Sequence, residues 1–250
     1  FLASAMDMEQ YIDSVVATAD HVGARVRSRK RIHLSFDEWN VWYQSHASAK
    51  GPPADWPVAP RLLEDTYNVA DGVVAGSLLI TLLRHSDRVA IACLAQLVNA
   101  IAPIRTEPGG RSWRQTTFYP FAHAARFARG RVLRVDVRAP TYPTEKYGEA
   151  PIVHAVATHD EERGEVTVFA VNRREFEPVE LSVAHQGFSR YRVVEHLELA
   201  DDDIRAANTD AEPDRVRPVR VSAPENSGDT VRVRLRPISW NVIRLARRPE

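Results

Sequence analysis

The stretch IHLSFDEWNVW, residues 32–42, decides how the first half of this chain is interpreted. Its apolar run ends at the acidic pair Asp37 and Glu38, and Trp42 and Tyr43 follow within a few residues. A run this short is typical of a β-strand, and the helix-period segment further along indicates a strand-helix unit. In β/α barrels the reactive side chains lie where strands end. A carboxylate at such an end, with aromatic rings beside it, suits an enzyme that acts on sugar.

Helices and a second strand are predicted on either side of this stretch. Apolar residues spaced by three and four predict an amphipathic helix over 8–26. A longer helix is predicted over 62–84, with two acidic residues in its first turn, and its apolar residues surround most of the cylinder. That helix must therefore be buried on several sides. Residues 89–95 are a continuous apolar run, which predicts a buried parallel strand that ends at Gln96.

The remaining segments of the first half predict loops and one more helix. Residues 43–60 contain Gly51 and several prolines, so we expect an active-site loop there. A helix is predicted over 115–129, with Gly130 placed to cap it. Cys93, the one cysteine, lies within an apolar run and is expected to be a small buried residue.

The pattern changes after residue 130. Short β-prone runs follow one another, several alternate apolar with polar residues, and turn signals separate them, as in an antiparallel sandwich. These runs cover 132–137, 153–158, 166–172, 179–183, 191–197, 216–221, 231–235 and 238–245. We therefore expect a chain of class α/β plus all-β: residues 1–130 are the C-terminal part of a (β/α)8 TIM barrel, and residues 131–250 are an antiparallel β-sandwich domain. Two strand-helix units cannot close a barrel, so we expect the chain to be the C-terminal part of a longer protein.

Composition and motifs exclude several classes of function. Lysine and arginine balance aspartate and glutamate at 33 each, so no overall charge favours nucleic acid or an anionic membrane. No apolar stretch is long enough to predict a membrane span. The nine histidines show no metal-ligand spacing, and neither a nucleotide-binding loop nor a serine-hydrolase elbow is present. We expect no metal, no cofactor and no nucleic-acid or membrane partner.

Glycoside cleavage usually requires two carboxyl groups on opposite sides of the scissile bond. Asp37 and Glu38 cannot be that pair, because neighbouring residues of a strand point to opposite faces. Strict alternation puts Glu38 with Leu34 and Phe36, but bulges re-aim side chains at strand ends. From spacing alone Glu38 is either catalytic or a surface carboxylate, and Asp37 fits a supporting hydrogen bond or a cap better.

The aromatic and amide neighbours also leave alternatives open. Trp39 fits the core, whereas Trp42 fits a sugar face as well as it fits the core. Gln96 ends an apolar strand, so its amide, if buried, needs a ligand hydroxyl or a backbone partner.

Seven segments together resemble the C-terminal half of glycoside hydrolase family 51, the α-L-arabinofuranosidases. In chain order they are HLSFDEWNVWY, LITLLRHSDRVAIACLAQLVN, IAPI, GGRSWRQTTFYPF, APTY, VTVFAVNR and SWNVIRL. The resemblance implies a (β/α)8 barrel fused to a β-sandwich and a retaining mechanism that releases terminal non-reducing α-L-arabinofuranosyl residues from arabinan, arabinoxylan and arabino-oligosaccharides. It implies that Glu38 is the catalytic nucleophile and that Trp42 and Gln96 bind the substrate.

One feature of that family has no counterpart in this chain. Its general acid/base is a glutamate within an Asn-Glu pair on an earlier strand, and nothing before Asp37 matches such a pair. The chain by itself is therefore expected to be inactive. The resemblance further implies a cytoplasmic homo-oligomer, often a hexamer. Two rival readings are a barrel endo-glycanase of another specificity and a non-catalytic carbohydrate-binding fragment.

Overall fold

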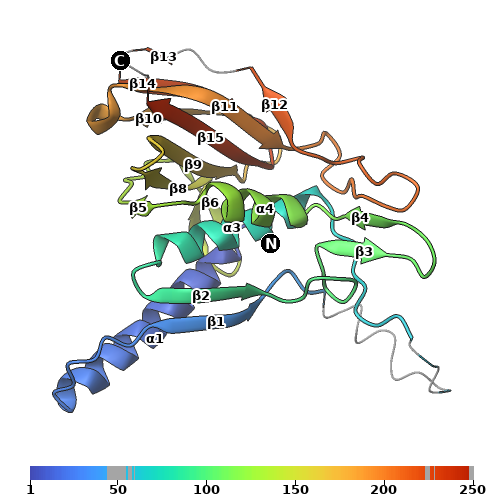
Figure 1. Ribbon diagram of the computed structural model, residues 1–250, viewed down its shortest axis with the longest axis horizontal. Coiled ribbons are helices and arrows are strands. Elements are labelled where there is room, and N and C mark those ends of the chain that lie inside the picture. Colours follow the sequence, from blue (N-terminus) through green and yellow to red (C-terminus); the bar gives the residue numbers. More distant parts are fainter. Residues whose placement is uncertain (44–54, 56–57, 59, 223–225, 228, 248–250) are drawn as a thin grey trace.

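The structure is a computed structural model that describes residues 1–43, 55, 58, 60–222, 226–227 and 229–247. Figure 1 shows two parts: strands of an antiparallel sandwich at the top, and a layer of strands and helices below it. Helices α3 (Val69–Arg84) and α4 (Phe118–Phe127) lie between the two. The predicted loop over 43–60 falls almost entirely outside the described residues. None of the described helices is long and apolar enough to cross a membrane.

The lower part follows the predicted order of helix, strand, helix and strand. These elements are α1 (Ala5–Arg25), β1 (Leu34–Trp39), α3 (Val69–Arg84) and β2 (Val89–Leu94). Strands β1 and β2 pair in parallel and form a two-stranded sheet, with α3 as the connection between them. A buried apolar cluster holds α1, α3 and the sheet together, and it includes Ile12, Trp39 and Leu79. The type and the order of these four elements are therefore as predicted.

Helix α3 is buried along nearly its whole length, as predicted, but it begins later than predicted. It starts at Val69, after the N-cap residue Asn68, and not at residue 62. The Asn68 and Asp71 side chains each accept a hydrogen bond from the backbone N–H of the other residue. This capping box satisfies two backbone N–H groups that have no partner within the helix. Leu63 has a φ of 56° and cannot continue a helix. The six-stranded sheet covers the second side of α3.

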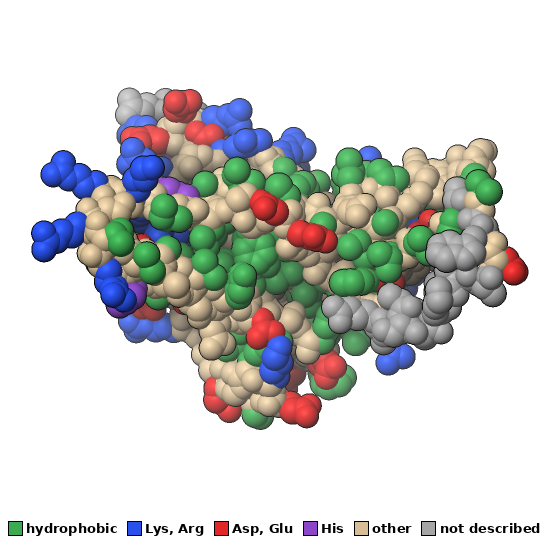
Figure 2. Space-filling model, turned by 90° about the horizontal axis from the view of Figure 1, so that it is seen from below, with side chains coloured by type: hydrophobic (Ala, Val, Ile, Leu, Met, Phe, Trp, Pro, Cys, Tyr) green, Lys and Arg blue, Asp and Glu red, His purple; other side chains and the backbone are tan. Residues whose placement is uncertain are grey.

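Strand β2, which was predicted to be buried, is largely exposed. In β2 only Val89 is buried, Ile91 is 54 % exposed, and Cys93 is exposed although it was expected to be buried. The reason is tertiary: within the described residues β1 is the only partner of β2. Figure 2 views this lower face and shows hydrophobic side chains gathered across its middle.

A hairpin and a short helix connect the lower part to the sandwich. The hairpin pairs β3 (Ile104–Thr106) with β4 (Ser112–Arg114) and was not predicted. Helix α4 covers Phe118–Phe127, within the predicted 115–129, and ends at the C-cap residue Ala128. Gly130 is therefore not its cap. Its φ of 76° and its close approach to the His159 carbonyl group still leave no room for a Cβ.

The upper part is an antiparallel β-sandwich. Its larger sheet has the order β12-β11-β15-β9-β8-β5, and its smaller sheet the order β10-β14-β13. The bounds are β5 (Arg131–Leu133), β8 (Val153–Asp160), β9 (Glu165–Asn172), β10 (Val179–Ala184), β11 (Tyr191–Leu199), β12 (Val219–Val221), β13 (Asn226–Ser227), β14 (Thr230–Leu235) and β15 (Ser239–Arg247). A separate hairpin joins β6 (Thr141–Thr144) to β7 (Gly148–Pro151), and a 3-10 turn, η1 (Gln186–Phe188), precedes β11.

The larger sheet has a core on each of its two faces. One face packs on the smaller sheet through residues such as Val168 and Val233, and the other packs on α3 and α4 through residues such as Phe169 and Trp240. Sequence neighbours Val168 and Phe169 thus enter different cores, as the period of two in a strand requires. A strand buried on both faces has a nearly continuous apolar sequence, which explains why 166–171 shows little alternation.

Candidate active site

Glu38 lies at the end of β1, and a bulge sets its direction. The register passes from Phe36 opposite Ala92 to Trp39 opposite Leu94, so β1 has one extra residue there. Leu34, Phe36 and Trp39 all pack against the helix-side cluster. The bulge therefore puts Trp39, and not Glu38, in the next core position, which leaves Glu38 exposed. Strict alternation, which would group Glu38 with Phe36, does not hold here.

The neighbouring acidic residue, Asp37, has a local partner. It is exposed, and its Oδ1 accepts a hydrogen bond from the hydroxyl group of Ser35, two residues earlier on the same face of β1. This is the supporting hydrogen bond that the sequence suggested for Asp37. Glu38, in contrast, makes no hydrogen bond or ion pair within the described part of the chain. Its carboxylate is therefore available to a ligand.

Trp42 and Gln96 lie near the same edge of the sheet as Glu38. Because β1 and β2 are parallel, their C-terminal ends meet at one edge. Trp42 follows β1, is 47 % exposed, and lines a hollow of about 470 Å³ together with Phe1 and Met8. Gln96 follows β2, is exposed, and is joined to Ala95 by a cis peptide bond. The fold thus brings one carboxylate, one indole and one amide to the same end of two strands.

Asn40, which was not predicted as a site residue, connects the two strand ends. Its Nδ2 donates to the carbonyl oxygen of Ala95 at 2.8 Å and also to that of Ile101. Its Oδ1 accepts the backbone N–H of Val41 at 2.8 Å. An amide directly after a strand is the signal that drew attention to Gln96, and the same signal could have identified Asn40.

A cluster of acidic and phenolic groups anchors the next residues of the chain. The Tyr43 hydroxyl group donates to Asp71 Oδ1 at 2.5 Å, and the Tyr43 backbone N–H donates to Asp65 Oδ2 at 3.1 Å. The Tyr67 hydroxyl group donates to the Val41 carbonyl oxygen at 2.5 Å. These bonds hold the backbone of Val41 and both the backbone and the side chain of Tyr43.

Burial controls the ionisation of two members of this cluster. Asp71 has no exposed surface, and burial raises the pKa of its carboxyl group to about 6, although the hydrogen bond from Tyr43 opposes the rise. Burial, and then the hydrogen bond to Asp71, raises the pKa of the Tyr43 hydroxyl group above its usual range. Asp71 is thus a buried acid that accepts the hydrogen bond of Tyr43.

Gln115 provides a second amide that holds the loops around this edge. It is fully buried, its Nε2 donates to the carbonyl oxygens of Asp65 and Ala102, and its Oε1 accepts the backbone N–H of Tyr67. The two acidic residues predicted for the first turn of α3 lie instead in this loop region, where Glu64 binds Arg105 at 2.8 Å.

The charged groups of this edge set limits on its chemistry. A single available carboxylate can act as a nucleophile or as a base, but one group cannot also protonate a leaving group on the opposite side of a bond. Asp37, Glu64, Asp65 and Asp71 each already accept hydrogen bonds. Among the described residues, histidine, cysteine, aspartate and glutamate do not gather in a group that could hold a metal ion.

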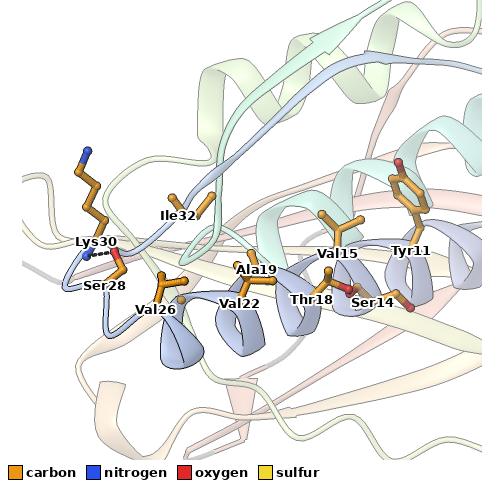
Figure 3. Close-up of a pocket in the computed structure, with 11 residues that line it drawn as sticks. Tyr11, Ser14, Val15, Thr18, Ala19, Val22, Val26, Ser28, Lys30 and Ile32 are labelled. Atoms are coloured by element: carbon orange, nitrogen blue, oxygen red, sulfur yellow. Dashed lines mark hydrogen bonds between the residues drawn. The ribbon is translucent and has the colours of Figure 1, made fainter.

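An apolar groove lies elsewhere, along α1. Figure 3 shows its lining side chains, which come mostly from one face of that helix, with Ile32 opposite them. The groove has a volume of about 590 Å³, and its helix hydroxyl groups, Ser14 and Thr18, bond to carbonyl groups of the same helix. None of Glu38, Trp42 and Gln96 lines it. The groove is an uncovered helix face and not a polar binding site.

The amino-acid sequence is similar to a known protein family and to several known enzymes. The family model described as the α-L-arabinofuranosidase C-terminal domain matches residues 37–239. An intracellular exo-α-(1→5)-L-arabinofuranosidase of Streptomyces lividans is 58 % identical over 98 % of this chain, which corresponds to 37 % of that protein. An exo-α-(1→6)-L-arabinofuranosidase of Bifidobacterium longum is 47 % identical over 97 % of this chain and 47 % of its own length.

Solved structures agree with the fold. A family 51 α-L-arabinofuranosidase from Bifidobacterium longum superimposes with a TM-score of 0.90 and 43 % identity, over 98 % of this chain and 48 % of that chain. A Thermotoga maritima α-L-arabinofuranosidase, solved as an arabinose complex, superimposes with a TM-score of 0.81 at 24 % identity and supports the fold alone. The chain spans about half the length of these relatives, or less.

Proposed function

This chain belongs to the α-L-arabinofuranosidase C-terminal domain family of glycoside hydrolase family 51, and on that basis we propose that it is the C-terminal part of a retaining exo-α-L-arabinofuranosidase. The complete enzyme releases terminal non-reducing α-L-arabinofuranosyl residues from arabinan, arabinoxylan and arabino-oligosaccharides. One observation carries the proposal: within the segment that the family model matches, Glu38 is exposed at the shared end of two parallel strands.

We further propose that residues 1–130 complete a (β/α)8 barrel whose earlier units precede this chain, and that residues 131–250 are the sandwich domain. The parallel β1–α3–β2 unit has the connectivity of such a barrel. The exposed side chains of β2 and the open groove along α1 are the surfaces that neighbouring strand-helix units would cover. The relatives are more than twice as long as this chain, and the additional length is enough for those units.

In the proposed mechanism the ionised Glu38 attacks the anomeric carbon of the arabinofuranosyl group. A glutamic acid of the preceding chain protonates the glycosidic oxygen as its bond to that carbon breaks. The same residue then takes a proton from water, which attacks the anomeric carbon and releases arabinose from the Glu38 ester. A retaining site holds the two carboxyl groups about 5 to 5.5 Å apart. Trp42 offers an apolar face to the sugar, and the Gln96 amide bonds its hydroxyl groups.

Replacement of the nucleophile tests this assignment. In the complete enzyme, Glu38→Gln keeps the size of the side chain but removes the attacking oxygen, so hydrolysis of an aryl α-L-arabinofuranoside should fall by roughly a thousandfold or more. In Glu38→Ala, added azide should enter the vacated space and form an arabinofuranosyl azide of inverted configuration.

Asp37→Ala is the matched control, because it removes the adjacent carboxylate without vacating the attacking position. It should show no azide product. Near-normal hydrolysis by Glu38→Gln would refute the role of Glu38. The products of wild-type hydrolysis separate the rivals: free arabinose supports the exo enzyme, and oligosaccharides favour an endo-glycanase.

Location and assembly are proposed by likeness to the relatives. The names of several relatives describe intracellular enzymes, so we propose a cytoplasmic protein. We also propose that the complete enzyme is a homo-oligomer, which light scattering would test. The 250-residue chain alone should be inactive, because the acid/base group is not part of it.

A further inference from the structure

We propose that Asn40 is a positioning residue that sets the distance between the nucleophile on β1 and the sugar-binding amide after β2. This inference rests on the proposed function, because it concerns how the groups of that site are held. Asn40 is half-buried and lies two residues after Glu38 and two before Trp42. Its side chain spans the gap between the ends of the two strands.

The contacts of the Asn40 side chain lead to Gln96 by two routes. The Ala95 carbonyl oxygen, which accepts from Nδ2 at 2.8 Å, belongs to the residue directly before Gln96. The Ile101 carbonyl oxygen accepts from Asn40 and also from the backbone N–H of Gln96, at 3.2 Å from the latter. Asn40 and Gln96 therefore share one acceptor, whose two lone pairs allow both bonds.

The backbone bonds between β1 and β2 end just before this bridge. The last backbone bond between the two strand ends runs from Ala95 N–H to the Trp39 carbonyl oxygen at 3.1 Å. Beyond it the chains separate, and the Asn40 side chain takes over as the bridge. Its Oδ1 is engaged by the Val41 N–H, which fixes the orientation of the amide, so that both Nδ2 hydrogens face the carbonyl groups.

The chemistry of the acceptors requires an amide. Aspartate has the same shape as asparagine, but it would direct a carboxylate oxygen toward two carbonyl oxygens and repel both. Alanine would leave both carbonyl groups without this donor. Either change should let the segment that carries Gln96 move away from the end of β1. In a site of this kind a displacement of about 1 Å costs roughly a hundredfold in rate.

The chain contains a matched control for this experiment. Asn172, at the end of β9 in the sandwich, donates from Nδ2 to the carbonyl oxygens of Glu177, Leu235 and Arg236, and its Oδ1 accepts the backbone N–H of Arg174. It is fully buried, whereas Asn40 is only half-buried. Asn172→Asp therefore introduces the same repulsion at a site that is at least as sensitive for folding, but outside the proposed active site.

The test compares Asn40→Asp and Asn172→Asp in the complete enzyme with an aryl α-L-arabinofuranoside as substrate. Each rate is divided by the concentration of folded protein, taken from the amplitude of the unfolding transition, so that loss of folded enzyme does not count. Asn40→Asp should lower kcat/KM per folded molecule by about 10- to 100-fold. Asn172→Asp should change it by less than about twofold.

A double-mutant cycle with Gln96→Ala identifies the route of the effect. If Asn40 acts by holding Gln96, then Asn40→Asp should cost less than about threefold further once Gln96 is already alanine. Three outcomes would overturn the inference. The first is a kcat/KM of Asn40→Asp within about twofold of wild type, and the second is an equal loss of kcat/KM in Asn172→Asp. The third is a double variant whose loss of kcat/KM equals the product of the losses in Asn40→Asp and Gln96→Ala. An active Glu38→Gln enzyme would instead overturn the proposed function, so the two failures are distinguishable.

Discussion

At the scale of single residues, one extra residue in β1 decides what Glu38 can do. Period-two alternation places Glu38 on the side of Leu34 and Phe36, which packs on the helices. The bulge moves Trp39 into that position. The sequence identified the acidic pair and the supporting role of Asp37, whereas the direction of Glu38 depends on its register against β2. Register is a property of two strands, and the residues of one strand do not define it.

The hydrogen bond from Tyr43 to Asp71 leads to a prediction about pH. The pKa of Asp71 in the folded protein, about 6, lies above the unfolded value of about 3.9, so this group makes the protein less stable as pH rises between the two values. The Tyr43 bond lowers the folded pKa and so reduces that loss. Tyr43→Phe should therefore cost about 1 kcal/mol at pH 5 and about 1.5 to 3 kcal/mol at pH 8, where Asp71 is ionised.

Urea unfolding of the complete protein at the two pH values measures this difference. Tyr147→Phe is the control, because its hydroxyl group binds the exposed Asp7 at the surface. A cost of Tyr43→Phe that is equal at pH 5 and pH 8 would contradict a charged Asp71 as the acceptor.

At the scale of elements, the helices were easier to detect than to delimit. The apolar period is strong enough to reveal α1, α3 and α4, but it continues into the loop that precedes Val69. The true start of α3 is the capping box of Asn68 and Asp71. The short hairpins β3–β4 and β6–β7 escaped prediction because strands of three or four residues carry too few positions for a period.

The contact between α1 and the end of α3 leads to a second pH prediction. Glu9 on α1 lies 3.8 Å from Nε2 of His85, the C-cap residue of α3, and Asp13 lies 3.7 Å from its Nδ1. Glu9 raises the pKa of His85 above 6.5 against the opposing effect of burial. A raised histidine pKa contributes stability that is fully present below the unfolded pKa and is lost as pH rises through the folded pKa.

His85→Gln should therefore destabilise the complete protein by roughly 0.5 to 1 kcal/mol at pH 5.5 and by much less at pH 9. Unfolding curves at both pH values measure the difference. His21→Gln, at an exposed position on α1, is the control and should show a smaller change with pH. The interpretation fails if His85→Gln is equally destabilising at both pH values.

At the scale of the whole molecule, α3 is the element on which both parts pack. One side of it joins α1 and the β1–β2 pair, and the other joins the six-stranded sheet. The apolar residues around most of this helix predicted its burial on several sides, which is confirmed. The second neighbour, however, is the sandwich of the same chain. The surfaces left open are those of β2 and α1, where Ile91 and Val22 are more than half exposed.

A glycine of α3 makes this contact possible and provides a test of it. A Cβ on Gly76 would overlap the indole ring of Trp240, which is fully buried on β15. Gly76→Ala should therefore destabilise the complete protein by about 1 to 3 kcal/mol, although alanine is the better helix former. Gly187→Ala, with no atom within 4 Å of the added Cβ, should change stability by less than about 0.5 kcal/mol. Thermal unfolding of both variants measures the difference, and a stabilised Gly76→Ala would contradict the close packing.

The sequence by itself determined the kind of each long element, the change from strand-helix units to an antiparallel sandwich, and the family, through motifs such as DEWNVWY. These features depend on residues that are close together in the chain. Only the tertiary structure decided the exposure of Cys93, the direction of Glu38 and the bridge made by Asn40. The exposure of Cys93 depends on how many strands flank β2. The direction of Glu38 and the Asn40 bridge depend on which segment lies opposite, and the residues that meet there are separated by fifty or more positions in the chain. Local spacing contains no information about such distant partners.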